Sequence, residues 1–298
     1  MFKYLKFLNS KKFKDLQRVI EYGETEQKLD LFKLRQSKFS QVNTPVFFLS
    51  SGRCGTAWLS QVLESKSNLK VYHHPEPVMR SQGKLAYEMN LNIEDRSESE
   101  KKLMKELFLA GREELLLNCA RANRRPIFTD SRSSFFAQQM LEIFPNAKFV
   151  HIHRHPGEFV RSGIRRSWYK AEQQSELNRI EPLPNSPYYE DWKRFSDIEK
   201  ISWLWLETNT FIEEFSNTLN PNNFFEISFN FWSPSKIEEM MTFLNIDLKE
   251  AEISSWMGKR INAQSESPFP KYQDWPKEDQ QSLKNICSEL AAKYNYQL

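Results

Sequence analysis

Short apolar segments alternate with longer amphipathic segments along most of this chain. The short segments are predicted to form buried strands, at 46–50, 69–72, 126–129, 148–153 and 223–227. The longer segments carry apolar residues at helical spacing, at 56–65, 99–121, 134–144, 156–169, 197–217, 234–244 and 276–293. This alternation predicts an α/β fold of three layers, αβα, in which helices cover both faces of a central parallel sheet.

Residues 1–40 differ in composition from the rest, being mostly polar and rich in Lys, with apolar residues at roughly helical spacing. We expect an N-terminal helical arm there, which either packs one face on the domain or contacts a membrane surface. No clear linker interrupts residues 41–298, which are expected to form a single domain. Within it, the polar segment 170–195 predicts an insertion, either a lid over a site or a plain surface loop.

Composition and charge narrow the classes of function. The chain has 298 residues, 39% of them hydrophobic, enough for one large α/β domain or two small ones. Its net charge of +3 is small for a nucleic-acid-binding protein, so no nucleic-acid partner is expected. No apolar run approaches the roughly 20 residues of a membrane span. The 3 cysteines are widely spaced and fit neither a disulfide framework nor a zinc site, which favours a cytoplasmic location.

The segment 45–58, PVFFLSSGRCGTAW, joins a predicted strand to a predicted helix through a short turn. The first N–H groups of a helix have no partner within the helix and bind anions, and Gly55 lets the backbone approach a ligand closely. Arg53 adds a positive charge, and the Ser and Thr residues of the turn add hydroxyls. The segment predicts a site for a phosphate or sulfate ester. The alternative is a turn whose glycines serve geometry alone.

A second strand end carries another candidate anion site. In the segment 144–168, FPNAKFVHIHRHPGEFVRSGIRRSW, Arg154 ends a predicted strand and Pro156 starts a helix that carries Ser162. An Arg at a strand end and a Ser on the following helix can hold one phosphate from two sides. The alternative is a surface Arg beside an exposed helical Ser.

Together, and in this order, the two motifs resemble the sulfotransferases that use 3′-phosphoadenosine 5′-phosphosulfate as the sulfuryl donor. SSGRCGTAWL is similar to the family's 5′-phosphosulfate loop, and KFVHIHRHPGEFVRSG is similar to its 3′-phosphate motif. NFFEISFNFW and the carboxyl-terminal segment from KRINAQSESP onward add to the resemblance, which spans about 45–297. It implies the sulfotransferase fold, which is similar to that of the P-loop nucleotide triphosphatases.

The resemblance also implies which residues bind the donor. They are Arg53, Cys54, Gly55, Thr56, Ala57 and Trp58 in the first loop, Arg154 and Ser162 in the second motif, and Arg260 near the carboxyl terminus. The loop departs from the family pattern at Cys54, where Ser or Thr is usual, and at Ala57, where a second Thr is usual, so Thr56 must do more. Cys54 is either a small filler or a thiol whose pKa is lowered at a helix start. In FTDSRSSFF, Arg132 is expected to take the basic role that a Lys fills in relatives.

The chemistry implied by the resemblance is transfer of a sulfuryl group to an acceptor hydroxyl or amine, with release of adenosine 3′,5′-bisphosphate and no required metal. Arg53 and the loop N–H groups are expected to stabilise the leaving phosphate. The acceptor proton needs a base, and VYHHPEPV supplies candidates just after the second strand. Relatives place a Glu or a His here, and Glu76 is preferred because carbohydrate and tyrosine sulfotransferases commonly use a Glu at this strand end. His74 and then His73 follow, since His titrates near neutral pH. Alternatively, Glu76 is an ordinary loop carboxylate and the histidines serve packing. A metal site is not expected, because no third His, Cys, Asp or Glu is clustered with these residues.

A carbohydrate or glycolipid hydroxyl is the preferred acceptor for two reasons. The candidate base is a Glu, and Tyr188, Tyr189 and Trp192 suit stacking on sugar rings. A small hydroxylated metabolite or phenol is the alternative acceptor. Arg161 and Arg165 share a helix face and either meet an anionic acceptor or form a solvated basic face. Two other classes compete: a non-catalytic nucleotide-binding relative, and a nucleotide kinase, which the missing Gly-Lys-Ser/Thr sequence disfavours.

Overall fold

A computed structural model describes residues 38–91, 96–170, 179–257 and 269–298. The chain divides into two compact units, Met1–Gln41 and Val42–Leu298. Of the first unit the structure describes one helical turn, at 38–41, so most of the predicted N-terminal arm lies outside the described residues. Every strand and helix named below belongs to the second unit. No helix of the described ranges is both long and apolar enough to cross a bilayer.

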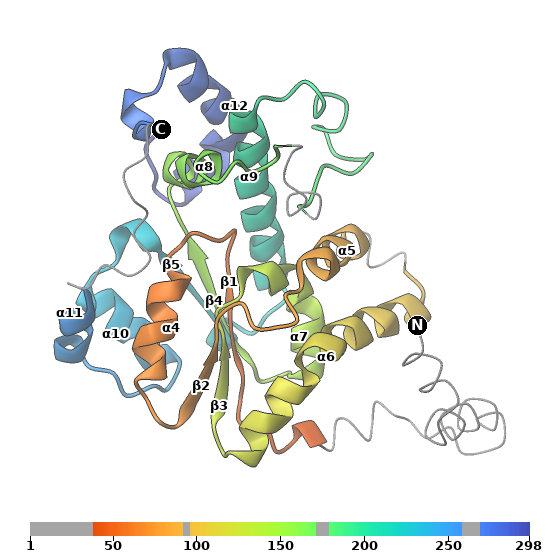
Figure 1. The fold of residues 1–298 in the computed structure, drawn as a ribbon, viewed down its shortest axis with the longest axis vertical. Helices are drawn as coiled ribbons and strands as arrows, with labels where there is room; N and C mark the ends of the chain where they lie inside the picture. Colours follow the sequence, from red (N-terminus) through yellow and green to blue (C-terminus); the bar gives the residue numbers. More distant parts are fainter. Residues whose placement is uncertain (1–37, 92–95, 171–178, 258–268) are drawn as a thin grey trace, which may run out of the picture. The chain divides into compact units, whose positions relative to one another are not determined.

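The second unit is built on a parallel sheet of 5 strands in the order β2-β3-β1-β4-β5 (Figure 1). The strands are β1 (Val46–Leu49), β2 (Leu69–Tyr72), β3 (Arg125–Phe128), β4 (Lys148–His153) and β5 (Phe224–Ser228). Each predicted strand is confirmed to within a residue at either end. β1 is central, since Val46 pairs with both Ile127 of β3 and Lys148 of β4.

Helices cover both faces of the sheet, which confirms the predicted three-layer α/β fold (Figure 1). One face carries α4 (Thr56–Glu64), α10 (Pro234–Phe243) and α11 (Glu250–Met257), and the other carries α6 (Glu98–Arg121) and α7 (Ala137–Ile143). The remaining helices are α5 (Arg80–Asn90), α8 (Pro156–Ile164), α9 (Asp197–Ser216) and α12 (Lys277–Lys293). Short 3-10 turns are η3 (Ser131–Phe136), η5 (Pro221–Asn223), η6 (Phe229–Phe231) and η7 (Tyr272–Asp274).

The hydrophobic pattern did not indicate two of these helices, α5 and α11. Both bury few large apolar side chains, so their helical periodicity is weak. α11 buries Ile253, and α5 buries Tyr87 together with the small residues Gly83 and Ala86. Packing against the rest of the domain, rather than local pattern, therefore decides these two segments.

Two predicted helices differ in extent. The segment 134–144 starts within η3 and becomes α-helical at Ala137, and α8 ends at Ile164 rather than at 169. Beyond α8, Ser167 and Tyr169 have φ values of 54° and 63°, which a right-handed helix does not accommodate. The chain therefore leaves the helical conformation before residue 169.

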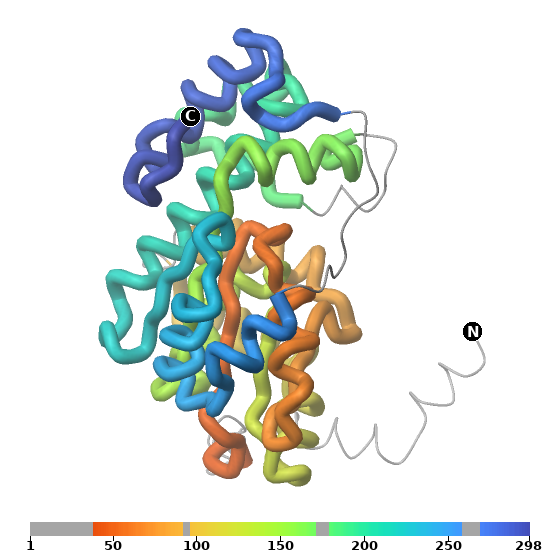
Figure 2. Tube along the Cα trace, turned by 90° about the vertical axis from the view of Figure 1, so that its left-hand side faces the viewer, coloured from red at the N-terminus to blue at the C-terminus, as the bar shows by residue number. Residues whose placement is uncertain are grey.

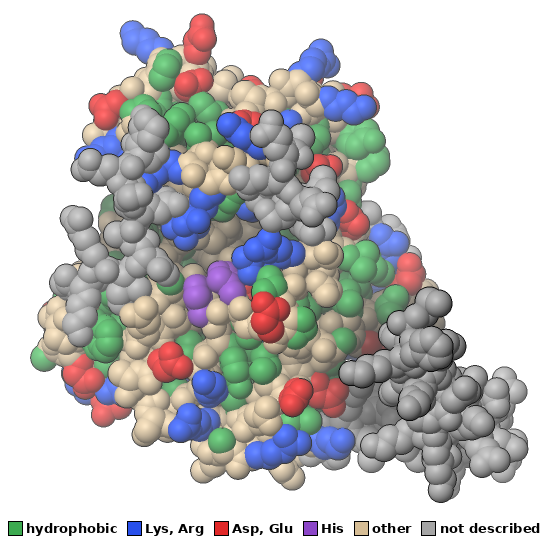
Figure 3. Space-filling view, viewed as in Figure 1, with side chains coloured by type: hydrophobic (Ala, Val, Ile, Leu, Met, Phe, Trp, Pro, Cys, Tyr) green, Lys and Arg blue, Asp and Glu red, His purple; other side chains and the backbone are tan. Residues whose placement is uncertain are grey.

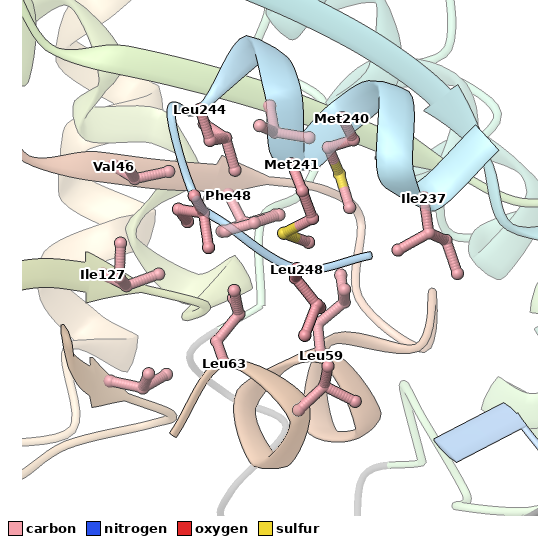
Figure 4. Close-up of a cluster of buried hydrophobic side chains, with 14 of the residues drawn as sticks. Val46, Phe48, Leu59, Leu63, Ile127, Ile237, Met240, Met241, Leu244 and Leu248 are labelled. Atoms are coloured by element: carbon pink, nitrogen blue, oxygen red, sulfur yellow. The ribbon is translucent and has the colours of Figure 1, made fainter. Parts of the chain in front are cut away.

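The face of β1 that carries Val46 and Phe48 packs against α4 and α10 (Figure 4). Other side chains of this cluster, among those that Figure 4 labels, are Leu59, Leu63, Ile127, Ile237, Met240, Met241, Leu244 and Leu248. Burial of each aliphatic side chain of this size contributes about 1.5–3 kcal/mol. The cluster fixes α4, and with it the loop that leads from β1 into α4.

The opposite face of β1 packs through an aromatic layer centred on Phe47. The Phe47 ring is stacked on Phe128 of β3 and Phe149 of β4, with centroids 5.4 and 5.6 Å away. Phe108 of α6 meets it edge-on at 6.2 Å, and Phe144 lies at 6.4 Å. Since successive side chains of a strand point to opposite faces, β1 is held between two separate cores.

The carboxyl ends of all strands meet at one edge of the sheet, where α8, α9 and α12 pack together (Figure 2). In open α/β sheets, ligands bind at this edge, between two neighbouring strands whose following connections lead to opposite sides of the sheet. β1 and β4 are such strands, because β1 leads through α4 to β2 on one side while β4 is followed by β5 on the other.

Replacement of Phe47 by Ala should lower the free energy of unfolding by about 3–5 kcal/mol, since it opens a void between four aromatic neighbours. Urea unfolding followed by circular dichroism measures this. Leu103→Ala is the matched control, because Leu103 is 59% exposed on α6 and its loss should change stability by less than about 0.5 kcal/mol. Equal effects of the two substitutions would contradict the central place of Phe47.

Candidate active site

A cavity of about 890 Å³ opens at the carboxyl edge of the sheet. Its lining includes residues of the loop after β1, the start of α4, the segment after β2, α5, η3, α8, α9 and η6. The space-filling view shows Lys and Arg side chains gathered around a hollow with His side chains at its edge (Figure 3). Among the described residues, the histidines that line the cavity are His73 and His74. Position and lining make this cavity the candidate active site.

The loop after β1 takes its shape from residues with positive φ. Gly52, Arg53 and Gly55 have φ values of 92°, 60° and 79°. Gly55 has no room for a side chain, because a Cβ there would lie 2.5 Å from the Phe229 ring and 2.6 Å from Trp232. Arg53 adopts a backbone conformation that is costly for any residue except Gly, and such strain concentrates at ligand-binding sites.

Hydrogen bonds within this loop explain the roles of Ser50 and Cys54. The Gly52 N–H donates to Ser50 Oγ over 3.2 Å, and Ser50 N–H donates to Ser134 Oγ over 3.1 Å, so the Ser50 side chain holds the turn. The Cys54 thiol donates to the Gly52 carbonyl over 2.9 Å, is fully buried and does not line the cavity. Burial raises the pKa of Cys54 to about 12. Of the two roles considered for Cys54, the structure favours the filler.

The start of α4 faces the cavity without a capping side chain. Thr56, Ala57 and Trp58 all line the cavity. The N–H groups of a first helical turn have no partner within the helix, and the helix dipole places partial positive charge there. The Thr56 hydroxyl forms no hydrogen bond with any residue in the described part of the chain. Both features suit an anion at this helix start.

Side-chain hydrogen bonds join the two predicted anion motifs into one site. Arg53 Nε donates to Ser162 Oγ on α8 over 3.0 Å. Arg154 donates through Nη1 to the Arg53 carbonyl over 3.0 Å and through Nη2 to Glu158 over 3.1 Å. The Trp205 indole donates to the Arg154 carbonyl over 2.7 Å. These contacts fix the ends of β1 and β4 against each other.

Positive charge dominates the cavity. The Lys and Arg residues that line it within the described ranges are Arg53, Arg80, Lys84, Arg132, Arg154, Arg161, Arg165, Arg166 and Arg179. Glu158 is the one acidic residue among the described lining residues. Burial, followed by the charges of Arg166 and Arg154, lowers the pKa of Arg53 to about 10. The like charges destabilise one another, so an anion in the cavity would relieve their repulsion.

Aromatic rings form a wall beside the start of α4. The Trp58 and Trp232 rings lie 5.4 Å apart, and Phe229 meets Trp232 edge-on at 4.9 Å. The Arg154 guanidinium lies 5.1 Å from the Phe229 centroid, and the Trp58 indole donates to the Trp256 carbonyl over 3.2 Å. Hydrogen bonding and ring packing thus hold this wall in place. Flat apolar surfaces of this kind suit a nucleotide base.

A chain of polar contacts leads from the cavity into the core through His74. His74 Nδ1 lies 2.8 Å from Asp130 Oδ1, and Arg112 Nη2 donates to Asp130 Oδ2 over 2.9 Å. The Asp130 and Arg112 side chains are 0% exposed. Because an ionised carboxylate only accepts hydrogen bonds, Nδ1 of His74 carries the proton and Nε2 of the neutral ring keeps a lone pair. His74 is thereby oriented as a proton acceptor.

Asp130 is held in its ionised form. Burial on its own raises the pKa of this carboxyl. The hydrogen bond and charge of His74, the charge of Arg112 and the N–H of Arg132 outweigh burial and lower the pKa of Asp130 below its ordinary value. The charge that orients His74 is therefore present throughout the neutral range.

The other two candidate bases are placed differently. His73 Nδ1 lies 3.0 Å from Thr129 Oγ1, and burial followed by the charge of His74 lowers the pKa of His73. Glu76 is exposed, its carboxylate accepts the Val78 N–H over 3.1 Å, and it is not among the residues that line the cavity. The structure thus brings His73 and His74 to the cavity and leaves Glu76, the first choice from sequence, outside its lining.

Several other predicted residues also lie elsewhere. Arg260 falls outside the described residues. Tyr188, Tyr189 and Trp192 do not line the cavity, and the Trp192 ring packs edge-on against Trp203 with centroids 5.0 Å apart. Within the described ranges, no group of three or more His, Cys, Asp or Glu side chains is placed to hold a metal ion.

Sequence reasoning did not identify the basic residues of α5 as part of the site. Arg80 and Lys84 line the cavity, yet α5 itself was not predicted. Their spacing of four residues is the one available signal, because it places both on one face if the segment is helical. Arg166 and Arg179, which in the sequence stand before and after the segment 171–178 that is not described, also line the cavity.

Comparisons with known proteins can be set beside this geometry. A sequence profile described as the sulfotransferase family matches residues 45–230. No curated protein sequence matches the chain. Among solved structures, the sulfotransferase domain from the curacin biosynthetic pathway is similar at 16% identity and a TM-score of 0.47, over 86% of this chain and 99% of that domain.

Two further solved structures show similarity of the same order. The sulfotransferase domain of the Synechococcus PCC 7002 olefin synthase has 17% identity and a TM-score of 0.47, over 86% of this chain and 96% of that one. A sulfotransferase from Alicyclobacillus acidocaldarius has 15% identity and a TM-score of 0.46, over 86% of this chain and 97% of that one.

Asp130→Asn should lower the free energy of unfolding by about 3–5 kcal/mol, because it leaves the Arg112 charge buried without its carboxylate. Urea unfolding at neutral pH measures the change. Asp247→Asn is the control, since the Asp247 side chain is 88% exposed and its pair with Lys249 should be worth less than about 1 kcal/mol. A similar, small effect of both substitutions would disprove the structural role of the buried pair.

The stability difference between wild type and Asp130→Asn should also depend on pH. The pKa of Asp130 is lower in the folded state than in the unfolded state, where an Asp titrates near about 4. Its contribution to stability is therefore complete above that pH and is lost as the pH falls through the folded-state pKa. We expect the difference to shrink on acidification below about pH 4. A difference that stays constant on acidification would refute the lowered pKa.

Proposed function

The chain belongs to the sulfotransferase family, since the family profile matches more than half of its length, and on that premise we propose that it transfers a sulfuryl group from 3′-phosphoadenosine 5′-phosphosulfate to an acceptor hydroxyl. Sulfuryl transfer follows from the family, whereas the donor and the acceptor are proposals. The observation that carries the donor proposal is the pair of hydrogen bonds that links Arg53 to Ser162 and Arg154 to Arg53. A nucleotide with anionic groups at both its 5′ and 3′ positions suits two anion sites joined in this way.

The residues present fit this donor. The uncapped start of α4, with Thr56 and Arg53, supplies donors for the 5′-phosphosulfate. Arg154 and Ser162, on the other side of the link, would hold the 3′-phosphate. The wall of Trp58, Phe229 and Trp232 offers rings against which an adenine can pack. Arg260, which the family resemblance adds to the 3′-phosphate site, stays a sequence prediction.

The donor supplies an activated sulfuryl group on a phosphate. Transfer breaks the bond between that sulfur and the phosphate oxygen and forms a bond from sulfur to the acceptor oxygen, whose proton must leave. Arg53 and the first N–H groups of α4 would stabilise the negative charge that grows on the leaving phosphate. They stand fixed before reaction, since the loop after β1 is held by its own hydrogen bonds and by α8.

We assign the proton of the acceptor to His74 in place of Glu76. His74 lines the cavity, and its contact with Asp130 orients the ring and stabilises the imidazolium that forms when Nε2 takes the proton. His73 also lines the cavity, but burial lowers its pKa, which makes it a weaker base. Glu76 accepts a hydrogen bond from its own loop and lies outside the lining.

The acceptor proposal is limited to a hydroxyl. A carbohydrate or glycolipid was preferred from sequence because of Glu76 and of the aromatic residues Tyr188, Tyr189 and Trp192, and none of these lines the cavity. A carbohydrate thus has no more support from cavity residues than a small hydroxylated metabolite or a phenol. A screen with labelled donor over sugars, glycolipids and phenols separates these classes.

Adenosine 3′,5′-bisphosphate should stabilise the protein against heat without Mg²⁺, and by more than adenosine 5′-monophosphate at the same concentration, because only the bisphosphate fills both anion sites. Differential scanning fluorimetry compares the two nucleotides. Arg53→Gln should abolish most of the shift, whereas Arg194→Gln, a substitution at an exposed residue whose side chain is 79% accessible, should not. Equal shifts from both nucleotides, or a need for Mg²⁺ and a triphosphate, would overturn the donor proposal.

His74→Gln should lower the turnover of labelled sulfate transfer by about 10²–10⁴-fold, since removal of a general base costs a factor of that size. Glu76→Gln should stay within a few-fold of wild type. Both variants should bind adenosine 3′,5′-bisphosphate as wild type does, which separates the chemical step from binding. If Glu76→Gln loses activity while His74→Gln keeps it, the assignment of the base is wrong.

A further inference from the structure

One side of the cavity carries positive charge that the donor sites do not use. Arg80 and Lys84 are four residues apart on α5, so they share a face of that helix, and both line the cavity. Arg132 of η3 lines it as well. Gly83 brings these elements together: a Cβ at Gly83 would lie 2.4 Å from the Arg132 carbonyl oxygen, so α5 packs directly on η3. We call Arg80, Lys84 and Arg132 the α5–η3 cluster.

The α5–η3 cluster has no acidic partner in the described part of the chain. The side chains of Arg80, Lys84 and Arg132 form no hydrogen bond or ion pair with any described residue. The charges of Asp130 and Glu76 act on Arg132 without an ion pair; Asp130 is already paired with Arg112 in the core, and Glu76 is exposed. Burial, followed by the charge of Arg80, lowers the pKa of Arg132. Cations brought together in this way, with Arg80 exposed and Lys84 and Arg132 partly buried, are typical of a site for an anion.

The charge of the donor does not account for this cluster. A nucleotide with a 3′-phosphate and a 5′-phosphosulfate carries about four negative charges, given the −1.5 to −2 of a phosphate monoester. Among the described residues, nine Lys and Arg residues line the cavity against Glu158, and three of the nine, Arg165, Arg166 and Arg179, have partners of their own. Arg53 and Arg154 already stand at the proposed donor sites, which leaves the α5–η3 cluster for another anionic group.

The cluster also lies next to the proposed base. Asp130 Oδ1 contacts His74 Nδ1 at 2.8 Å and accepts the backbone N–H of Arg132 over 3.2 Å. One buried carboxylate therefore positions both the proton acceptor and a residue of the cluster. A negative group bound by the cluster would sit in the part of the cavity where the acceptor hydroxyl must reach His74.

We propose that the α5–η3 cluster binds a negatively charged group of the acceptor, so that the substrate is a hydroxylated anion carrying a carboxylate, phosphate or sulfate. That the anion belongs to an acceptor rests on the proposed function. That the cluster binds an anion does not depend on it. It names a substrate class that neither the family nor the fold specifies.

Inorganic phosphate is the probe, titrated calorimetrically into protein that adenosine 3′,5′-bisphosphate has saturated, so that the donor sites are filled. The test variant is Arg80→Gln/Lys84→Gln, which removes two charges from partly exposed positions of α5. The control is Lys236→Gln/Lys249→Gln, which removes two charges whose side chains are 59% and 68% exposed elsewhere on the surface. Circular dichroism and the melting temperature show whether each variant is folded.

Wild type and the control should bind phosphate with a dissociation constant in the millimolar range, and the test variant should bind it about tenfold or more weakly, as the loss of charge-assisted hydrogen bonds implies. Binding of the bisphosphate itself should be the same in all three proteins. Absence of phosphate binding to saturated wild type, or equal binding by all three, would overturn the proposal.

Failure of the proposed function gives a different result. In that case wild type does not bind adenosine 3′,5′-bisphosphate at all. The phosphate titration is then read on the protein without nucleotide, where weaker binding to Arg80→Gln/Lys84→Gln than to the control still supports the cluster as an anion site, and equal binding refutes it. Weaker binding of the bisphosphate to the test variant would assign the cluster to the donor instead, which also overturns the proposal.

Discussion

The parallel pairing of β1 with β3 on one side and β4 on the other is the constraint on which the site depends. Since all three strands run the same way, the segments that follow them emerge side by side at one edge. The loop after β1 brings Arg53 and Thr56, the segment after β3 brings Asp130 and Arg132, and the end of β4 brings Arg154. Cores on both faces of the central strand hold these segments in register.

The cavity concentrates like charges, and the protein stabilises them in two ways. In the core, the Arg112 charge is balanced by Asp130, and the cost of burying this pair is offset by hydrogen bonds at both carboxylate oxygens. At the surface of the cavity, Arg154 pairs with Glu158, whereas Arg53 donates to Ser162 and has no carboxylate partner among the described residues. An anionic ligand would relieve the remaining repulsion among the cations. The same repulsion therefore destabilises the free protein and favours binding of an anion.

Much of this fold was predictable because apolar runs mark buried parallel strands directly. Each strand was predicted to within a residue at either end, and the two anion-binding motifs that follow β1 and β4 were identified from the sequence. The position of the base could not. Glu76 and His74 lie in one short loop, and which of them faces the cavity depends on the φ of 51° at His74 and on Asp130, which is distant in sequence. α5 could not be predicted either, because it is positioned by contact with η3, where Gly83 packs against the Arg132 carbonyl, and not by apolar periodicity.

A crystal structure of the protein with adenosine 3′,5′-bisphosphate tests the central claim most directly, namely that linked strand ends form one cradle for both phosphate groups. The account predicts the 5′-phosphate at the start of α4, within hydrogen-bonding distance of Thr56 and Arg53, and the 3′-phosphate on Arg154 and Ser162. It also predicts that neither phosphate contacts the α5–η3 cluster. A nucleotide whose phosphates lie on that cluster, or outside the cavity, would contradict the account.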